Sequence, residues 1–190
     1  TPVVLQFGVS WCEPESQEVN HGDGPTEAFY AATPPLEAKR LLFSQWATER
    51  KRDGKHLKIS CVDIKKAYFN GRPKRSMYVR LPPELGLPKD TVGKLERCMY
   101  GTRDAAANWE AKYADHLVLN GFISGNSSPC VFWNPDTGVR CVVHGDDFTF
   151  AGDETKLKKC VKKDEDEYED KVRGLPGPDK HDDKSITILN

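Results

Sequence analysis

The chain lacks the features that mark a membrane-spanning or secreted protein. Across its 190 residues no apolar run approaches the ~20 residues that cross a bilayer, and the N-terminus has no basic region followed by an apolar stretch. Its six cysteines are scattered without a CxxC pair, which disfavours a disulfide framework and a zinc site. We therefore expect one compact domain with buried free thiols, an intracellular setting and no membrane partner.

The chain also has almost no net charge, −1 at neutral pH, although affinity for phosphate chains is mainly electrostatic. The charge is unevenly distributed, however. Residues 39–80 contain thirteen Lys or Arg against three acidic residues, a local net charge of +10. Such a stretch suits binding of a template, a primer or a triphosphate. A solvated helix face followed by a basic loop is the alternative interpretation.

Hydrophobic periodicity and turn residues predict an α+β chain. Helices are expected over residues 36–52, 104–119 and 154–169. A strand is predicted at 57–63 and a hairpin at 139–151. Trp109, in the second helix, fits a core position. The first thirty residues are expected to be irregular, and residues 174–183 to form an exposed loop.

Three aspartates carry most of the chemical information. Asp146 and Asp147 lie at the predicted hairpin tip in VVHGDDFTFAG, and Asp63 ends the predicted strand LKISCVD. Strand ends next to a hairpin can bring remote carboxylates together. A hard cation such as Mg²⁺ relieves their mutual repulsion and prefers oxygen ligands. Because Gly and Asp also favour solvated turns, a metal site and a plain turn are both retained at this point.

The motifs around these aspartates resemble, in order, those of the reverse transcriptase of copia-type long-terminal-repeat retrotransposons. The similar blocks are VDIKKAYFNG (62–71), MYVRLPPELG (77–86), GKLERCMYGTRDAAANWEAKY (93–113), GFISGNSSPCVFWN (121–134), VVHGDDFTFAG (142–152) and YEDKVRG (168–174). The resemblance implies a polymerase palm-like antiparallel sheet backed by helices, with a partial fingers region. We accordingly expect an irregular fingers remnant (1–38), a palm-like domain (39–174) and an exposed tail or the start of a truncated next segment (175–190).

The resemblance also implies an activity, RNA-directed DNA polymerisation by two-metal transfer of a nucleotide onto a primer 3′-hydroxyl. Asp63, Asp146 and Asp147 would be the catalytic residues and the ligands of two Mg²⁺ ions, with Mn²⁺ as an alternative. Such ions lie about 3.5–4 Å apart and stabilise the attacking and leaving oxygens together. Because adjacent strand residues point to opposite faces, we expect Asp63 and Asp146 to be the principal ligands and Asp147 the weaker one.

Nucleotide-binding roles follow from the same resemblance. The backbone of Ile64 and Lys65 would line the triphosphate side. Tyr68 would close off the 2′ position of the sugar, with a core tyrosine as the alternative. Lys171 would hold or protonate pyrophosphate, unless it is simply solvated.

The resemblance further implies contacts with bases and with an RNA or DNA template and its primer. Tyr100 and Gly101 would lie beneath the incoming deoxynucleoside triphosphate and the templating base, where a glycine permits close approach. The residues expected to contact nucleic acid are Arg72, Lys74, Arg75, His144 and Gly145. The last two stand where the family usually has a tyrosine and a branched residue, and their role is open.

Two further hypotheses remain beside an active polymerase. The chain could be a catalytically inactive retroelement relic that keeps the fold and nucleic-acid binding, or an unrelated acidic-turn protein that binds a partner or Ca²⁺. If the chain is an active polymerase or an inactive relic, we expect it to be a polyprotein fragment whose thumb, RNase H and integrase regions come from the same polyprotein.

Overall fold

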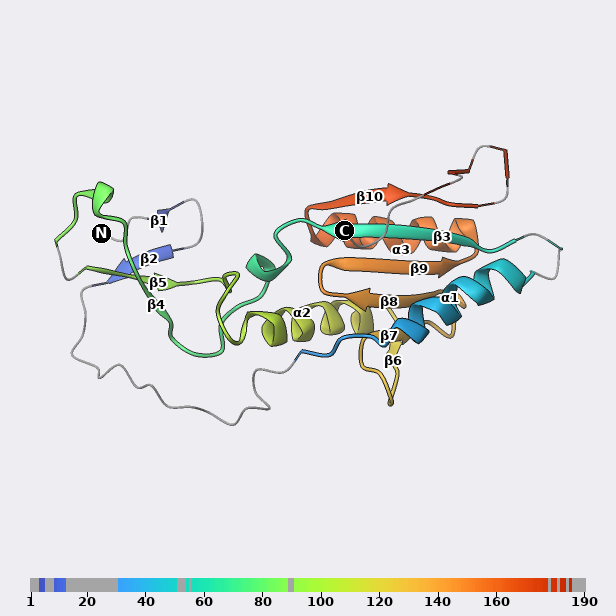
Figure 1. The fold of residues 1–190 in the computed structure, drawn as a ribbon, viewed down its shortest axis with the longest axis horizontal. Helices are drawn as coiled ribbons and strands as arrows, with labels where there is room; N and C mark the ends of the chain where they lie inside the picture. The colour runs from blue at the N-terminus through green and yellow to red at the C-terminus, as the bar shows by residue number, and fades with distance from the viewer. Residues whose placement is uncertain are drawn as a thin grey trace. The chain divides into compact units, whose positions relative to one another are not determined.

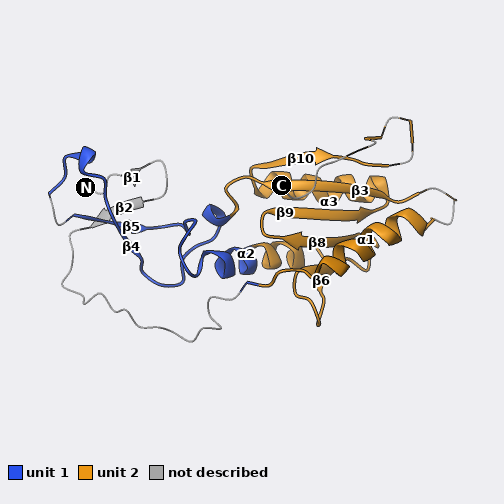
Figure 2. Cartoon of the chain, in the orientation of Figure 1, with its two compact units in different colours: residues 1–31, 68–112 blue, residues 32–67, 113–190 orange. Residues whose placement is uncertain are grey.

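A computed structural model of the chain (Figure 1) describes residues 4–5, 9–12, 31–50, 54, 56–88, 91–177, 179–180, 182–183 and 185. These residues form an α+β structure with three α-helices and two antiparallel sheets. The chain divides into two compact units (Figure 2): unit 1 comprises residues 1–31 and 68–112, and unit 2 comprises residues 32–67 and 113–190. No helix in this described part is long and apolar enough to cross a membrane.

Unit 2 is built on a six-stranded antiparallel sheet with the order β10-β3-β9-β8-β7-β6. Its strands are β3 Lys58–Ile64, β6 Ile123–Ser124, β7 Val131–Trp133, β8 Arg140–His144, β9 Asp147–Gly152 and β10 Asp170–Gly174. The predicted hairpin is confirmed: β8 and β9 are joined by Gly145 and Asp146. Gly145 has φ +65°, the left-handed conformation that a two-residue hairpin turn requires.

Helices pack on this sheet and bury its central strands. The α1 helix (Leu36–Thr48) contributes Leu42 to a cluster with Ile59 and Val142. The α3 helix (Glu154–Glu167) packs against β3 and β9. On the sheet face opposite to that cluster, Phe148 meets Tyr113 edge to face at 5.6 Å. Packing on both faces explains why β9 is buried at every position.

Unit 1 contains a four-stranded antiparallel sheet in the order β1-β2-β5-β4. Its strands are β1 Val4–Leu5, β2 Val9–Cys12, β4 Tyr78–Arg80 and β5 Val92–Leu95. Short 3₁₀ helices, η2 at Ala67–Asn70 and η3 at Pro83–Leu85, precede β4 and follow it. The first two strands fall where we expected irregular structure, because β2 pairs with the sequence-distant β5. The remainder of that expectation, residues 1–3, 6–8 and 13–30, lies outside the described residues.

The α2 helix (Ala105–Leu119) occupies the predicted position and is followed by Gly121 at φ +86°. Trp109, Tyr113 and Leu117 are at most 3% exposed, so the core interpretation of Trp109 is confirmed. Free, buried thiols are confirmed as well for most of the described cysteines: Cys61, Cys98, Cys130 and Cys141 are buried, while Cys160 is partly exposed.

The α1 helix is shorter than predicted. It ends at Thr48 because Glu49 adopts an extended conformation, and Arg50 then forms a β-bridge with His56. The expected helical residues 49 and 50 are therefore not part of α1, and residues 51–52 lie outside the described residues.

The segment after β10 is not simply an exposed loop, as its glycines and prolines predicted. Pro176 is buried and forms a bridge with Asp183. Lys58 of β3, only 4% exposed, forms ion pairs with Asp179 and Asp182. Because a buried ammonium group is costly unless paired, these contacts fasten the segment to unit 2.

Candidate metal and nucleotide site

Four of the predicted residues lie in one row across the sheet of unit 2. In register, Lys171 of β10 faces Asp63 of β3, Asp63 faces Asp147 of β9, and Asp147 faces His144 of β8. Residues directly opposite one another in antiparallel pairs share a face of the sheet. The row therefore brings two carboxylates and two basic side chains together on one face, although their positions span 109 residues of sequence, from 63 to 171.

The two carboxylates of this row share one cation, Arg173 of β10. Its Nη2 lies 3.1 Å from Oδ2 of Asp63 and 3.5 Å from Oδ1 of Asp147. The hydrogen bond to Asp63, together with the nearby negative charges of Asp147 and Asp146, raises the pKa of Arg173 above its ordinary value. We did not predict this residue. The sequence signal was incomplete, because Arg173 follows Lys171 by two positions but the register of β10 shifts between Val172 and Gly174, which interrupts strand alternation.

Asp146 occupies the exposed tip of the β8–β9 hairpin. Its backbone carbonyl accepts a hydrogen bond of 2.9 Å from the N–H of Ile64, which holds the tip beside the end of β3. All three predicted aspartates thus lie at one end of the antiparallel sheet. The register partner of Asp63 is Asp147, and our ranking of Asp146 above Asp147 as a metal ligand stays a prediction. Strand alternation does not apply to Asp146, because that residue is part of the turn.

The carboxylates at this end of the sheet are partly desolvated. Burial raises the pKa of Asp147, Arg173 opposes the shift, and Asp146 and Asp63 add to it. Burial also lowers the pKa of His144, with a contribution from the positive Lys39, which favours a neutral imidazole at pH 7. Carboxylates crowded in such surroundings are the groups that gain most from a bound cation.

The donor set fits Mg²⁺ in chemistry. Carboxylate oxygens are the ligands that this ion prefers, and Asp63 and Asp147 are close enough to contact one guanidinium nitrogen. In the described part of the chain, however, no three His, Cys, Asp or Glu side chains already form a metal-binding group. The Arg173 guanidinium already lies between Asp63 and Asp147. A metal ion bound by both carboxylates would therefore compete with Arg173 for their oxygens.

Besides Lys171 and Arg173, a third cation, Lys39 of α1, lies near these carboxylates. Its side chain is 4% exposed, and Nζ has no hydrogen-bond partner among the described residues. Burial lowers its pKa, while the negative charge of Asp147 opposes that shift. A buried position excludes Lys39 from contact with nucleic acid, as burial also excludes Lys58. The basic stretch 39–80 is therefore not one continuous binding surface.

The predicted triphosphate-side backbone is already hydrogen-bonded within unit 2. The N–H of Ile64 donates to Asp146, and the N–H of Lys65 donates to the carbonyl of Glu169 at 2.9 Å. The Lys65 ammonium, on a side chain that is 48% exposed, also pairs with the Glu169 carboxylate at 2.9 Å. A triphosphate contact at this position would accordingly come from the Lys65 side chain.

The aromatic residues that we assigned to nucleotide binding lie together in unit 1. The ring centroids of Tyr68 and Tyr100 are 4.4 Å apart, and Phe69 lies 5.8 Å from Tyr100. Tyr68 is partly exposed and Tyr100 is 47% exposed, so both rings keep a solvent-accessible surface. Gly101 follows in an exposed turn at φ +88°, a conformation that favours glycine.

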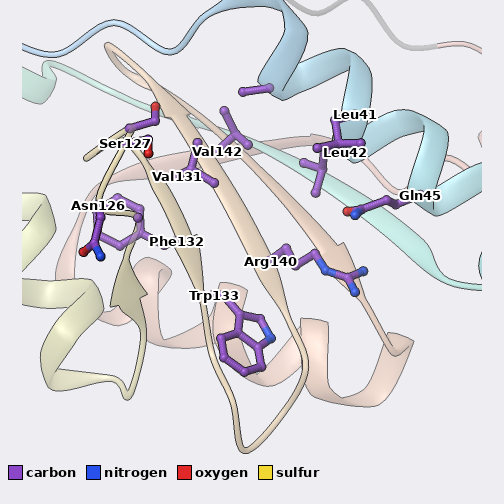
Figure 3. Close-up of a pocket in the computed structure, with 13 residues that line it drawn as sticks. Leu41, Leu42, Gln45, Asn126, Ser127, Val131, Phe132, Trp133, Arg140 and Val142 are labelled. Carbon is purple, nitrogen blue, oxygen red and sulfur yellow. The ribbon is translucent and has the colours of Figure 1, made fainter.

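A cavity of about 580 Å³ lies in unit 2 between α1 and the strands β7 and β8 (Figure 3). Leu41 and Leu42 reach it from the helix, and Val131 and Val142 from the strands. The Arg140 guanidinium at its rim is paired with Glu49 at 2.8 Å. None of the three aspartates lines this cavity. With a mainly apolar lining and its one charged group already paired, it offers no chemistry for the predicted reaction.

The fold and the site thus define an α+β chain with an acidic end on an antiparallel sheet. In sequence, the chain is similar to Gag-Pol polyproteins of Saccharomyces cerevisiae transposons. It is 29% identical over 118 residues to the Transposon Ty1-GR3 and Ty1-OR Gag-Pol polyproteins; the matched region covers 62% of this chain and 7% of those proteins. The Truncated transposon Ty1-A Gag-Pol polyprotein matches with the same identity over 10% of its length.

No protein-family model matches the chain. Its similarity to the transposon polyproteins supports a retrotransposon origin. The chain spans less than a tenth of the two longer relatives, so the polyprotein names do not specify to which part of Gag-Pol it corresponds.

Proposed function

We propose that the chain is the palm-like part of a reverse transcriptase, an RNA-directed DNA polymerase encoded by a retrotransposon. The observation that carries the proposal is the carboxylate arrangement. Asp63 and Asp147 lie in register on adjacent strands, and Asp146 lies at the hairpin tip beside them. The similarity to Gag-Pol polyproteins supports the same conclusion, because polymerases of such elements copy RNA into DNA.

The proposed reaction joins a primer 3′-hydroxyl to the α-phosphorus of a deoxynucleoside triphosphate and releases pyrophosphate. Two bound Mg²⁺ ions, or Mn²⁺, would neutralise the charge that develops on the attacking and leaving oxygens. Asp63 and Asp147 would hold them from β3 and β9, and Asp146 from the hairpin tip. Arg173 orients the first two carboxylates toward each other before the substrates bind.

Basic residues near the row would receive the phosphates. Lys171, in register with Asp63, would hold or protonate the departing pyrophosphate, and Lys65 would contact the triphosphate. Both are exposed, so their ammonium groups are accessible to a ligand. An ammonium group contributes as a mobile point charge that can follow the phosphate through the reaction.

Selection of the sugar would depend on Tyr68. Its ring packs against Tyr100 at 4.4 Å, which restricts its movement. A fixed ring beside the sugar would exclude a 2′-hydroxyl by steric conflict. Gly101 next to Tyr100 would leave room for the templating base.

Primer extension with Mg²⁺ tests the proposal, measured on this chain within a Gag-Pol segment that carries its flanking regions. Asp146→Asn should abolish extension, because a neutral amide does not compensate the charge of a metal ion. Asp166→Asn is the matched control, since Asp166 is exposed on α3 and pairs only with Lys162 among the described residues. Extension by Asp146→Asn at the control rate would refute the catalytic assignment.

Nucleotide selectivity gives a second readout of the same function. Tyr68→Ala should raise incorporation of ribonucleotides relative to deoxynucleotides, because it removes the ring that would meet the 2′-hydroxyl. Tyr68→Phe should retain the wild-type preference, because it keeps the ring. Equal selectivity in all three proteins would exclude a sugar-selecting role for Tyr68.

A catalytically inactive relic is the second candidate function. The observation that favours it is the Arg173 ion-pair network, which already compensates part of the negative charge of Asp63 and Asp147. A relic should bind nucleic acid without extending a primer in any flanking context. In calorimetry, the wild-type relic and its Asp146→Asn variant should also give the same heat on addition of Mg²⁺.

A further inference from the structure

Unit 1 has its own basic cavity, of about 350 Å³. Five cationic side chains line it: Arg72, Lys74, Arg75, Lys94 and Arg97. Among the described residues of its wall, Glu96 is the only acid. The sequence had indicated three of these cations. The fold adds Lys94 and Arg97, from β5 and the turn after it, and makes the group concave.

An exposed aromatic side chain lies next to this cavity on the same sheet. Lys94 of β5 is in register with Tyr78 of β4, so the two side chains share a face. Arg80 lies two positions beyond Tyr78, on the same face, and is exposed. The Tyr78 side chain is 51% exposed. The β4–β5 face thus combines a tyrosine ring with a row of cations.

Three of the five cations in this cavity have no ion pair with the described residues of unit 1. Arg75 lies 3.6 Å from the Asp104 carboxylate, and Arg97 donates a long hydrogen bond of 3.4 Å to the carbonyl of Asn70. No ion pair joins Arg72, Lys74 or Lys94 to another described residue. Like charges held this close repel one another, so a polyanionic ligand would relieve the repulsion.

We propose that the β4–β5 face binds a single strand of nucleic acid, with its phosphates in the basic cavity and one base stacked on Tyr78. The inference rests on the proposed function, since a template strand must be held as it is copied. A positive groove beside an exposed aromatic ring is the arrangement by which proteins bind single strands without sequence preference. A duplex offers a free base face only at its two ends, because its interior bases are stacked on each other.

The first test measures binding of a fluorescent oligo(dT) strand to the full chain in EDTA, without triphosphates, over a range of salt concentrations. Lys94→Ala/Arg97→Ala should weaken binding and reduce the log–log salt slope by about 0.7 for each phosphate that the variant no longer neutralises. The matched control is Lys159→Ala/Lys163→Ala, which removes the same charge from two exposed positions on α3. An equal effect of the two double variants would overturn the proposal.

The second test separates base stacking from charge. Tyr78→Ala should weaken oligo(dT) binding by about ten-fold and leave the salt slope unchanged, whereas Tyr78→Phe should bind as the wild type does. A blunt duplex of the same length should compete poorly with oligo(dT). Full affinity of Tyr78→Ala, or equal competition by the duplex, would overturn the single-strand assignment. Urea unfolding verifies that each variant is folded.

The binding and catalytic proposals can fail separately. Asp146→Asn should bind oligo(dT) as the wild type does, because binding in EDTA requires no metal. If Asp146→Asn abolishes extension while the Lys94/Arg97 and Tyr78 variants bind normally, the strand site is wrong and the polymerase assignment stands. If those variants lose binding but no protein extends a primer, the strand site stands and the polymerase assignment fails.

Discussion

The two units use charged residues in opposite ways. In unit 2 several charged residues are paired within the fold: Arg173 with Asp63 and Asp147, Lys58 with Asp179 and Asp182, and Lys65 with Glu169. In unit 1 the cations of the basic cavity are mostly exposed, and among the described residues only Arg75 of this group forms an ion pair, with Asp104. Charge in unit 2 fixes a geometry, whereas charge in unit 1 is accessible to a ligand.

This difference corrects an interpretation based on net charge. The sequence suggests one basic stretch from residue 39 to 80 around Asp63, yet two of its lysines are buried in unit 2, and Arg72, Lys74 and Arg75 belong to unit 1. Substitutions in the two units should therefore affect different properties. Changes in unit 2 should alter stability and its pH dependence, and changes in unit 1 should alter ligand binding.

The largest stability effect is expected from Lys58→Met, which removes the ammonium group that pairs with the Asp182 carboxylate, 8% exposed. Removing one member of a buried ion pair costs about 3 kcal/mol or more, measured by urea unfolding. Lys158→Met is the control, because the exposed Lys158–Glu154 pair should contribute at most about 0.5 kcal/mol. Asp182→Asn in the Lys58→Met background should recover part of the loss. Equal losses for Lys58→Met and Lys158→Met would show that Asp182 is hydrated.

Arg173→Met should have the next largest effect, because it leaves Asp63 and Asp147 to repel each other. We expect a loss of about 1–2 kcal/mol at neutral pH, below that of a fully buried pair because all three groups retain some exposure. Arg173 opposes the burial that raises the pKa of Asp147, so its contribution is present where Asp147 is ionised and is lost as the pH falls and that carboxyl is protonated.

Urea unfolding of Arg173→Met at several pH values, with and without Mg²⁺, tests this expectation. A loss that persists in acid would show that Arg173 acts by packing. If Mg²⁺ binds between the carboxylates, it should restore part of the stability of Arg173→Met at neutral pH. No recovery would weigh against a metal site shared by Asp63 and Asp147.

A smaller effect, of opposite sign, is expected at Asp170 of β10. Burial, with repulsion from Glu165 and Asp164, raises the pKa of Asp170 to about 6. A carboxyl group with a raised folded-state pKa contributes stability below its unfolded-state pKa, and that contribution is lost as the pH rises through about 6. Asp170→Asn should therefore stabilise the chain by about 1 kcal/mol at pH 8 and have little effect in acid. A gain that is independent of pH would contradict this assignment.

The smallest stability effect is expected in unit 1. Arg72→Ala/Lys74→Ala removes two exposed cations that have no ion pair with another described residue, so the free energy of unfolding should change by less than about 0.5 kcal/mol. The same variant should weaken oligo(dT) binding and flatten its salt dependence. A large loss of stability would show that these residues support the fold, and would remove the contrast between the two units.

Local patterns predicted the central elements of unit 2 well. The strand 57–63 and the hairpin 139–151 agree with β3 and with β8–β9 to within a residue or so, because alternation and a Gly-Asp turn are short-range signals. The end of α1 was harder to predict, since the extended conformation of Glu49 accompanies the bridge between Arg50 and His56. The strands β1 and β2 were missed because their pairing depends on β5.

The sequence by itself determined which residue types could make a site: two aspartates at a glycine turn, a third at a strand end, and a block of cations. Tertiary structure alone decided their neighbours. Strand register placed Asp147 opposite Asp63, and β10 brought in Arg173 from more than a hundred residues away. Folding also buried Lys39 and Lys58, added Lys94 and Arg97 to one basic cavity, and placed Tyr78 in register with Lys94. The physical reason is that turn and strand preferences act over a few residues, whereas ion pairing, burial and cavity shape depend on segments that meet only in the folded chain.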